Sequence, residues 1–231
     1  MPRCPALVLF DIDGTLLRHA GPHHREALSH AVKMVFGIDA TTEGVPVAGM
    51  LDRDILTAML LRERISLRRI RREMPRLVNE SELVYQRTCP DLRAKVCPGV
   101  RGLLYKLSRR GIPASLVTGN FSSIGWKKME RAGLRHYFAY GAFAEMAADR
   151  TGLVKIAVQH ARRQGWIQKH SPIALLGDHP NDIRAAKANG VRSIAVATGI
   201  VGEDELAQHR PDLLVEDMRG LTVERVLGLL A

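Results

Sequence analysis

Asp11-Ile12-Asp13-Gly14-Thr15-Leu16 decides the fold of this chain of 231 residues. The stretch follows Ala6-Leu7-Val8-Leu9-Phe10, a short apolar run that predicts a strand buried in a parallel sheet. Its two carboxylates therefore come at the carboxyl end of a strand, where open α/β sheets bind their ligands. Ionised carboxylates need protons, cations or hydrogen-bond donors, so the pair indicates a functional site in preference to a polar turn with an aspartate N-cap.

Polar residues also follow two later apolar runs. Residues 112–117 predict a strand that ends in Thr118-Gly119-Asn120, and residues 173–176 predict one that ends in Gly177-Asp178. Parallel strands point the same way, so their carboxyl ends lie on one edge of the sheet and can converge. The carboxylates gathered there form an oxygen-rich pocket that suits Mg²⁺. They are Asp11, Asp13, Asp178 and, one helical turn beyond the last strand, Asp182.

The segment from 19 to 92 separates the first strand from the rest and shows mainly helical patterns. Helices are expected at 24–36, at 52–64, from 67 onward and at 80–88, with Pro75 kinking or ending the third. This block of about seventy residues is long enough to be a small domain. We therefore expect a core formed by residues 1–18 and 93–231 and an inserted all-helical cap domain formed by 19–92.

Helices and strands alternate after residue 98. Helices are expected at 100–109, 122–131, 153–163 and 181–188, near 204 and from 222, and further strands at 137–143, 193–197 and 212–215. This alternation predicts an α/β fold, with a central parallel sheet connected by right-handed crossovers. The expected architecture is a three-layer Rossmann-like core that carries the helical cap.

Composition narrows the class of protein. Hydrophobic residues make up 46% of the chain and charged residues 25%, as in ordinary soluble globular proteins. The cysteines Cys4, Cys89 and Cys97 follow no metal-ligand spacing, so we expect reduced thiols in a cytoplasmic protein, with a disulfide between two of them left open. The apolar run before Asp11 fits neither a signal peptide nor a membrane span, so no membrane segment is expected.

The formal net charge is +10, and a basic surface attracts polyanions. Aromatic residues make up only 5% of the chain and no nucleic-acid-binding motif is recognisable. We therefore expect a solvated, arginine-rich surface that helps to attract an anionic substrate, and no nucleic-acid partner. The chain is expected to be a monomer or a homodimer.

The motifs together resemble those of the haloacid dehalogenase superfamily, and within it the phosphoglycolate-phosphatase-like branch with a helical cap. Residues 11–16 match the first motif of that family, 117–120 the second and 177–182 the fourth. The helical insertion matches the cap in place and character, so the resemblance covers nearly the whole chain. One motif alone is weak evidence, but three in the right order at strand ends are specific.

The resemblance implies a role for each matching residue. Asp11 would be the nucleophile that forms an aspartyl-phosphate, and Asp13 the acid/base that protonates the leaving oxygen and later activates water. Phosphate oxygens would be held by Thr118 and the N–H groups of Gly119 and Asn120. Magnesium would be bound by Asp11, Asp13 through its backbone carbonyl, Asp178 and Asp182.

The third motif of the family, commonly Lys-Pro in a loop before the fourth motif, is where this chain departs from the pattern. The region reads Asp149-Arg150-Thr151-Gly152-Leu153-Val154-Lys155 and holds no Lys-Pro pair. Arg150 has the better loop position, whereas Lys155 falls inside an expected helix. We favour Arg150 as the cation that bridges nucleophile and phosphate and keep Lys155 as the second candidate.

Residues of the expected cap and of the fourth motif add candidates with open alternatives. Gly49-Met50-Leu51-Asp52-Arg53 resembles a cap loop that touches substrate in related phosphatases, so Asp52 and Arg53 are candidates for substrate binding, with a surface turn as the alternative. His179 either lines the site or caps a helix. The histidines near the expected cap hinge are interpreted mainly as exposed loop residues, with a role in the hinge or in substrate binding as the alternative; they are His19, His23 and His24.

The leading hypothesis is a Mg²⁺-dependent phosphatase that hydrolyses a small phosphorylated metabolite, phosphoglycolate-like or a sugar phosphate, through an aspartyl-phosphate. A sugar phosphomutase shares the same core and is the enzymatic alternative. A non-catalytic binding or regulatory module is less favoured, because a cluster of like charges without chemistry has no reason to persist.

Overall fold

The computed structural model describes residues 5–229. Its strands form one six-stranded sheet in the order β3-β2-β1-β4-β5-β6, and every strand pair is parallel. The predicted parallel α/β fold is thus confirmed. The strands are β1 (Leu7–Phe10), β2 (Ala114–Val117), β3 (Phe138–Ala142), β4 (Ile173–Gly177), β5 (Arg192–Val196) and β6 (Leu213–Val215).

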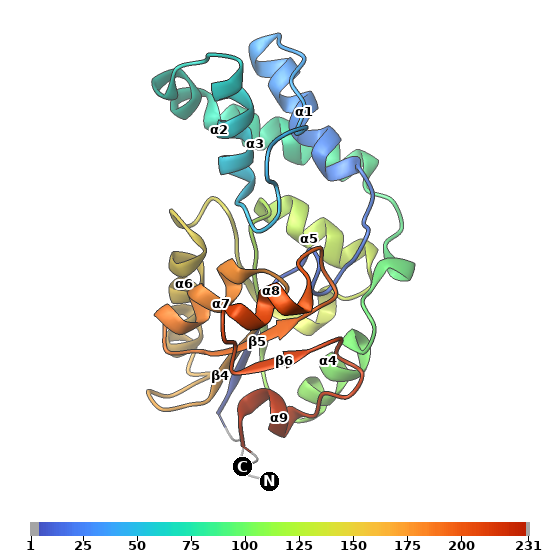
Figure 1. Cartoon of the computed structure of the whole chain (residues 1–231), viewed down its shortest axis with the longest axis vertical. Helices are drawn as coiled ribbons and strands as arrows, with labels where there is room; N and C mark the ends of the chain where they lie inside the picture. Colours follow the sequence, from blue (N-terminus) through green and yellow to red (C-terminus); the bar gives the residue numbers. More distant parts are fainter. Residues whose placement is uncertain (1–4, 230–231) are drawn as a thin grey trace.

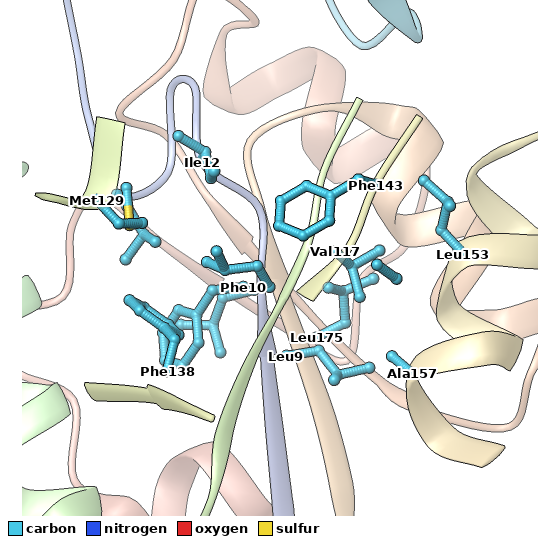
Figure 2. Close-up of a cluster of buried hydrophobic side chains, with 14 of the residues drawn as sticks. Leu9, Phe10, Ile12, Val117, Met129, Phe138, Phe143, Leu153, Ala157 and Leu175 are labelled. Carbon is cyan, nitrogen blue, oxygen red and sulfur yellow. The ribbon is translucent and has the colours of Figure 1, made fainter. Parts of the chain in front are cut away.

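Strand β1 lies inside the sheet because all four of its residues are apolar and fully buried. Side chains alternate between the two faces of a strand. In Figure 2, Phe10 accordingly lies toward Phe138 and Leu9 toward Ala157. The rings of Phe10 and Phe138 meet edge to face with centroids 6.0 Å apart. These contacts hold β1 in position within the sheet, and they thereby also set the position of the residues that follow β1.

The chain adds strands β2 and β3 on one side of β1 and then β4, β5 and β6 on the other side, so the strand order reverses at β1. Strand β1 pairs with β2 on one side and with β4 on the other, although β4 follows β1 by about 160 residues in the chain. Open α/β sheets bind ligands at such a reversal, outside the carboxyl ends of the strands. The loops that leave β1, β2 and β4 are therefore neighbours.

Helices cover both faces of the sheet and complete a three-layer core (Figure 1). Helices α6 and α7 pack against each other and against the central strands, and α4 and α9 pack against each other and against β2 and β4. The core helices are α4 (Val100–Arg109), α5 (Ser122–Arg131), α6 (Arg150–Arg163), α7 (Pro180–Ala188), α8 (Glu203–Gln208) and α9 (Val223–Leu227).

The segment between β1 and α4 folds into α1 (His23–Phe36), α2 (Asp52–Arg62) and α3 (Leu67–Thr88), which lie together at one end of the molecule, where α3 contacts α5 of the core (Figure 1). Its two connections to the core run side by side: Leu17 pairs with Val96 in an antiparallel bridge, and the N–H of Arg18 donates to the carbonyl of Lys95 at 2.9 Å. We propose residues 19–92 as the limits of this cap.

Helix α3 does not end at Pro75, which was one of the two outcomes predicted there, and it includes the helix predicted separately at 80–88. Proline removes one backbone hydrogen bond from a helix interior and clashes with the preceding turn. Here Ile70, Leu77 and Tyr85 are buried on both sides of the proline, and α3 packs along α1. Burial of this apolar face outweighs the local penalty, which the sequence pattern alone does not show.

Cys89 and Cys97 are free, buried thiols, and Cys4 lies outside the described residues. Within residues 5–229 no helix has both the length and the apolar character needed to cross a membrane.

Candidate active site

A cavity of about 520 Å³ lies between the carboxyl edge of the sheet and the cap. Its floor contains Asp11, Asp13, Thr118, Arg150 and Asp178, from four separate stretches of the core. Cap residues close it from above, and they come from the start of α1 and from the loop that enters α2. The convergence of strand ends predicted from the sequence is therefore present in the fold.

Asp11 is buried at the end of β1, and Arg150 is the cation beside it. The guanidinium Nη1 of Arg150 lies 2.9 Å from Asp11 Oδ1 and 2.9 Å from Asp182 Oδ1. Burial lowers the pKa of Arg150, but the carboxylates of Asp182 and Asp11 outweigh it and raise the pKa above its ordinary value. The guanidinium therefore stays charged between the two carboxylates.

Arg150 is the first residue of α6 and not a loop residue, which corrects the prediction that this helix begins at 153. The helix starts earlier because the side chain of Asp149 caps it, accepting a hydrogen bond of 2.7 Å from the N–H of Gly152.

Lys155, the second candidate for this cation, is not brought to the site. It is exposed on α6 and does not line the cavity. Successive residues of a helix are rotated by about 100°, so five residues after Arg150 the side chain points to a different side of α6.

Asp178 and Asp182 form a buried acidic group with Asp11. One carboxylate oxygen of each residue lies within 4.8 Å of the others. Burial, followed by the charges of Asp11 and Asp182, raises the pKa of Asp178 to about 8; burial also raises the pKa of Asp182, to about 7. The group thus has more negative charge than Arg150 compensates, and it is a suitable place for a divalent cation.

Glycines around Asp178 allow its carboxylate to reach the cavity. A Cβ on Gly14 would lie 2.0 Å from Asp178 Oδ2, and one on Gly199 would lie 1.8 Å from the same atom. Gly14 also has φ +86°, a conformation that favours glycine. The hydroxyl of Thr15 donates to Asp178 Oδ1 at 3.0 Å and fixes the carboxylate. The residues after Asp13 are therefore needed for the position of Asp178.

Asp13 is held by donors on both carboxylate oxygens. Lys128 Nζ lies 2.7 Å from Oδ1 and 2.6 Å from Oδ2, and Asn120 Nδ2 donates to Oδ2 at 2.8 Å. Burial raises the pKa of Asp13, but the charge and the hydrogen bonds of Lys128 outweigh it and lower the pKa. The Asp13 side chain is 44% exposed, and it lines the cavity. It is thus anchored yet accessible to a ligand there.

Asp52, predicted to bind substrate, is buried, and one of its carboxylate oxygens makes hydrogen bonds within the protein. Its Oδ2 accepts a hydrogen bond of 2.8 Å from the N–H of Phe121 and lies 3.0 Å from His24 Nε2. Its own N–H donates to the carbonyl of Gly119 at 2.7 Å. Asp52 therefore joins the cap to the second motif, in addition to lining the cavity.

Other predicted residues divide between cavity and periphery. Thr118, Gly119 and Asn120 line the cavity, whereas Arg53 does not and donates instead to the carbonyl of Ala148. His179 fulfils both of its alternatives: it lines the cavity, and its Nδ1 accepts from the N–H of Asn181 as the N-cap of α7.

Lys128 was missed by the sequence prediction, and the favoured interpretation of His24 was wrong. His24 belongs to α1 and its side chain is only 18% exposed, so it is not an exposed loop residue. Lys128 is 1% exposed. A signal for it existed: Lys128 falls on the same helical stripe as Ile124 and Met129, where a charged residue is unexpected unless it is paired.

Comparison with known proteins agrees with this geometry. A family model described as haloacid dehalogenase-like hydrolase matches residues 5–190. A phosphoglycolate phosphatase of Vibrio cholerae is 27% identical over 237 residues, which cover 96% of this chain and 96% of that protein. The resemblance inferred from the motifs is thus confirmed.

Solved structures show the same fold. A CbbY mutant from Rhodobacter sphaeroides in complex with xylulose-(1,5)bisphosphate matches with a TM-score of 0.70 at 20% identity, covering 96% of this chain and 98% of that one. A β-phosphoglucomutase from Clostridium difficile matches with a TM-score of 0.69 at 18% identity, covering 95% and 94%. Since the family model spans most of the chain and its motif residues converge on one cavity, this protein belongs to the haloacid dehalogenase-like hydrolases.

Proposed function

We propose that the protein is a Mg²⁺-dependent phosphatase that hydrolyses a small phosphorylated metabolite through an aspartyl-phosphate on Asp11. The observation that carries the proposal is the arrangement of Asp11 and Asp13 in one cavity, the first beside Arg150 and the second held by Lys128 and Asn120. Phosphoryl transfer needs a fixed nucleophile, a proton donor and compensating positive charge, and these residues supply all three.

In this proposal a carboxylate oxygen of Asp11 attacks phosphorus while the bond from phosphorus to the ester oxygen breaks. Because its pKa is lowered, Asp13 must first take up a proton, which it then gives to the departing oxygen. Asp13 then takes a proton from a water molecule that attacks the phosphorus of the aspartyl-phosphate, which releases phosphate and restores Asp11. Arg150 compensates charge beside Asp11, and Thr118 with the N–H groups of Gly119 and Asn120 holds phosphate oxygens.

The residues present fit a magnesium ion. Asp11, Asp178 and Asp182 offer buried carboxylate oxygens close to one another, and burial, together with the neighbouring carboxylates, raises the pKa values of Asp178 and Asp182. We propose that these carboxylates and the backbone carbonyl of Asp13 hold the ion. When bound, Mg²⁺ supplies countercharge to the nucleophile and the phosphate.

The cavity supports a small substrate, because its volume of about 520 Å³ is that of a site for small molecules. Within that class we propose a phosphoglycolate-like ester or a sugar phosphate. The relative from Vibrio cholerae that is named a phosphoglycolate phosphatase supports the first of these.

The decisive experiment compares the wild-type protein with Asp11→Asn, using p-nitrophenyl phosphate and Mg²⁺ and measuring free phosphate. We expect turnover in the wild type and a loss of at least about a thousandfold in the variant, because an amide does not replace the nucleophile. Equal inactivity of the two folded proteins would overturn the enzymatic proposal.

A sugar phosphomutase remains the alternative within this fold, and the solved β-phosphoglucomutase shares the fold alone. The two activities are separated by a hexose 1-phosphate. A phosphatase releases stoichiometric inorganic phosphate from it, whereas a mutase returns a hexose 6-phosphate with little free phosphate.

A further inference from the structure

A chain of four polar residues joins the cap to the proposed acid/base. Asp52 and His24 come from the cap, and Lys128 and Asp13 from the core. Asp52 Oδ2 lies 3.0 Å from His24 Nε2, His24 Nδ1 lies 3.1 Å from Lys128 Nζ, and Lys128 Nζ contacts both oxygens of Asp13. Asp13 is therefore linked to Asp52 through two intervening side chains.

The direction of these hydrogen bonds follows from chemistry. The ammonium of Lys128 has three donors and no acceptor, so His24 Nδ1 accepts from it. The proton of the imidazole is then on Nε2, which donates to Asp52. Asp52 in turn is fixed by the N–H of Phe121. Each member thus constrains the next from Phe121 through to Asp13.

Burial makes this chain depend on the closed cap. Lys128 is 1% exposed, so its ammonium needs acceptors within the protein. Asp13 offers its two carboxylate oxygens, and His24 Nδ1 is the further acceptor. The ring of Tyr85, also from the cap, lies 5.9 Å from Lys128 Nζ and packs edge to face on His24. Separation of the cap from the sheet removes His24, Asp52 and Tyr85 together from around the ammonium.

We propose that Lys128 is a positioning residue for Asp13, and that His24 and Asp52 hold Lys128 in place from the cap. The inference rests on the proposed function of Asp13 and names the residues that orient its carboxylate for proton transfer.

Leaving-group dependence tests the role of Lys128. p-Nitrophenolate leaves readily without a proton, whereas the alkoxide of 2-phosphoglycolate needs one. We therefore expect Lys128→Met to lower kcat/KM by at least about tenfold for 2-phosphoglycolate and by less than about threefold for p-nitrophenyl phosphate. Lys128→Arg, which keeps the charge, should restore part of the loss.

Two further variants show whether the effect passes through the chain. His24→Phe keeps a ring to pack against Tyr85 but removes both nitrogens, and it should change the ratio of the two kcat/KM values in the same direction as Lys128→Met. In an Asp13→Asn background, Lys128→Met should change the ratio no further, because the effects of residues that act as a unit are not additive.

Lys127→Met is the matched control: Lys127 is the adjacent residue of α5, it pairs with Glu130, and its loss should leave the ratio unchanged. Equal losses on both esters would overturn the positioning role.

Acylation with acetic anhydride, read by peptide mass spectrometry, tests the link to the cap without any turnover. In the wild type Lys128 should be modified at least about tenfold more slowly than exposed Lys155, and His24→Phe and Asp52→Asn should remove much of that protection. Unchanged protection in both variants would overturn the link to the cap. If the wild type hydrolyses neither ester while Lys128 shows this pattern, the proposed function fails and the positioning role fails with it, but the cap contact stands.

Discussion

Arg150 makes the closest described cationic contact to the proposed nucleophile, since its Nη1 lies 2.9 Å from Asp11 Oδ1. Its Nε is buried and has no partner within residues 5–229, while the residue lines the cavity. Arg150 therefore contacts the nucleophile through Nη1 and keeps a buried donor that has no partner among these residues.

Arg150→Ala should lower kcat/KM for p-nitrophenyl phosphate by at least about tenfold, because one preorganised cation next to the reacting groups is lost. Arg150→Lys should lose less, since it keeps a charge at the same helix terminus. Lys155→Ala is the comparison on the same helix and should stay within about twofold of the wild type, as expected for an exposed residue away from the site. Thermal melts of each variant separate loss of activity from loss of fold. A larger defect in Lys155→Ala than in Arg150→Ala would contradict the assignment.

At the scale of elements, the loop that enters α2 lies directly on the start of α7 and on the loop that follows β2. The amide of Asn181 donates to the carbonyl of Gly49 at 2.8 Å, and the N–H of Asp52 donates to the carbonyl of Gly119 at 2.7 Å. Backbones approach so closely that a Cβ on Gly119 would lie 2.2 Å from the carbonyl oxygen of Met50. Gly119 is thus required for the contact between cap and core, in addition to its proposed phosphate contact.

Gly119→Ala should displace the cap loop and lower kcat/KM by about tenfold or more, because small displacements of positioning groups have large effects on rate. The melting temperature should change little, since the sheet and its core are untouched. Gly102→Ala is the matched control: it lies in α4, a Cβ there meets nothing within 4 Å, and the change should stabilise the protein by about 0.5–1 kcal/mol without affecting activity. Full activity of Gly119→Ala would show that the cap loop adapts.

At the scale of the whole molecule, the acidic group makes stability depend on pH and on metal. Asp178 and Asp182 have pKa values of about 8 and about 7 in the folded protein, against an ordinary value of 3.8. At pH values between 3.8 and about 8, the folded state binds protons that the unfolded state has released, so the free energy of unfolding falls as pH rises. Asp13, whose pKa is lowered, acts only below this window.

The metal-free protein should therefore melt at a lower temperature at about pH 8.5 than at about pH 5, by roughly 5 °C. Addition of about 10 mM MgCl₂ should restore most of the loss at the higher pH and have little effect at the lower one, because the ion binds ionised carboxylates. Asp178→Asn should flatten both responses. Differential scanning calorimetry measures all three, and a melting temperature that rises steadily across this range without metal would contradict the charge imbalance.

Local patterns in the sequence were enough to predict the layout of the core. The apolar runs before Asp11, Thr118 and Asp178 predicted strands, and the parallel arrangement of such strands places their ends together whatever the details of packing. The ends of helices were predicted less accurately. Helix α6 is capped by Asp149 and starts three residues earlier than its apolar periodicity indicates, and α3 does not end at Pro75. In both cases one capping or packing contact outweighed a local preference.

The sequence by itself determined which carboxylates meet, because each of them follows a strand whose place is set by hydrophobic burial. Only the tertiary structure decided what holds Asp13, since Lys128 lies 115 residues away on a helix stripe that otherwise reads as apolar. It also decided that Asp52 joins cap to core, through contacts with residues 28 and 69 positions distant. Such pairings depend on how helices pack against one another, and a helical period shows which face of a helix is buried but not which side chain it meets.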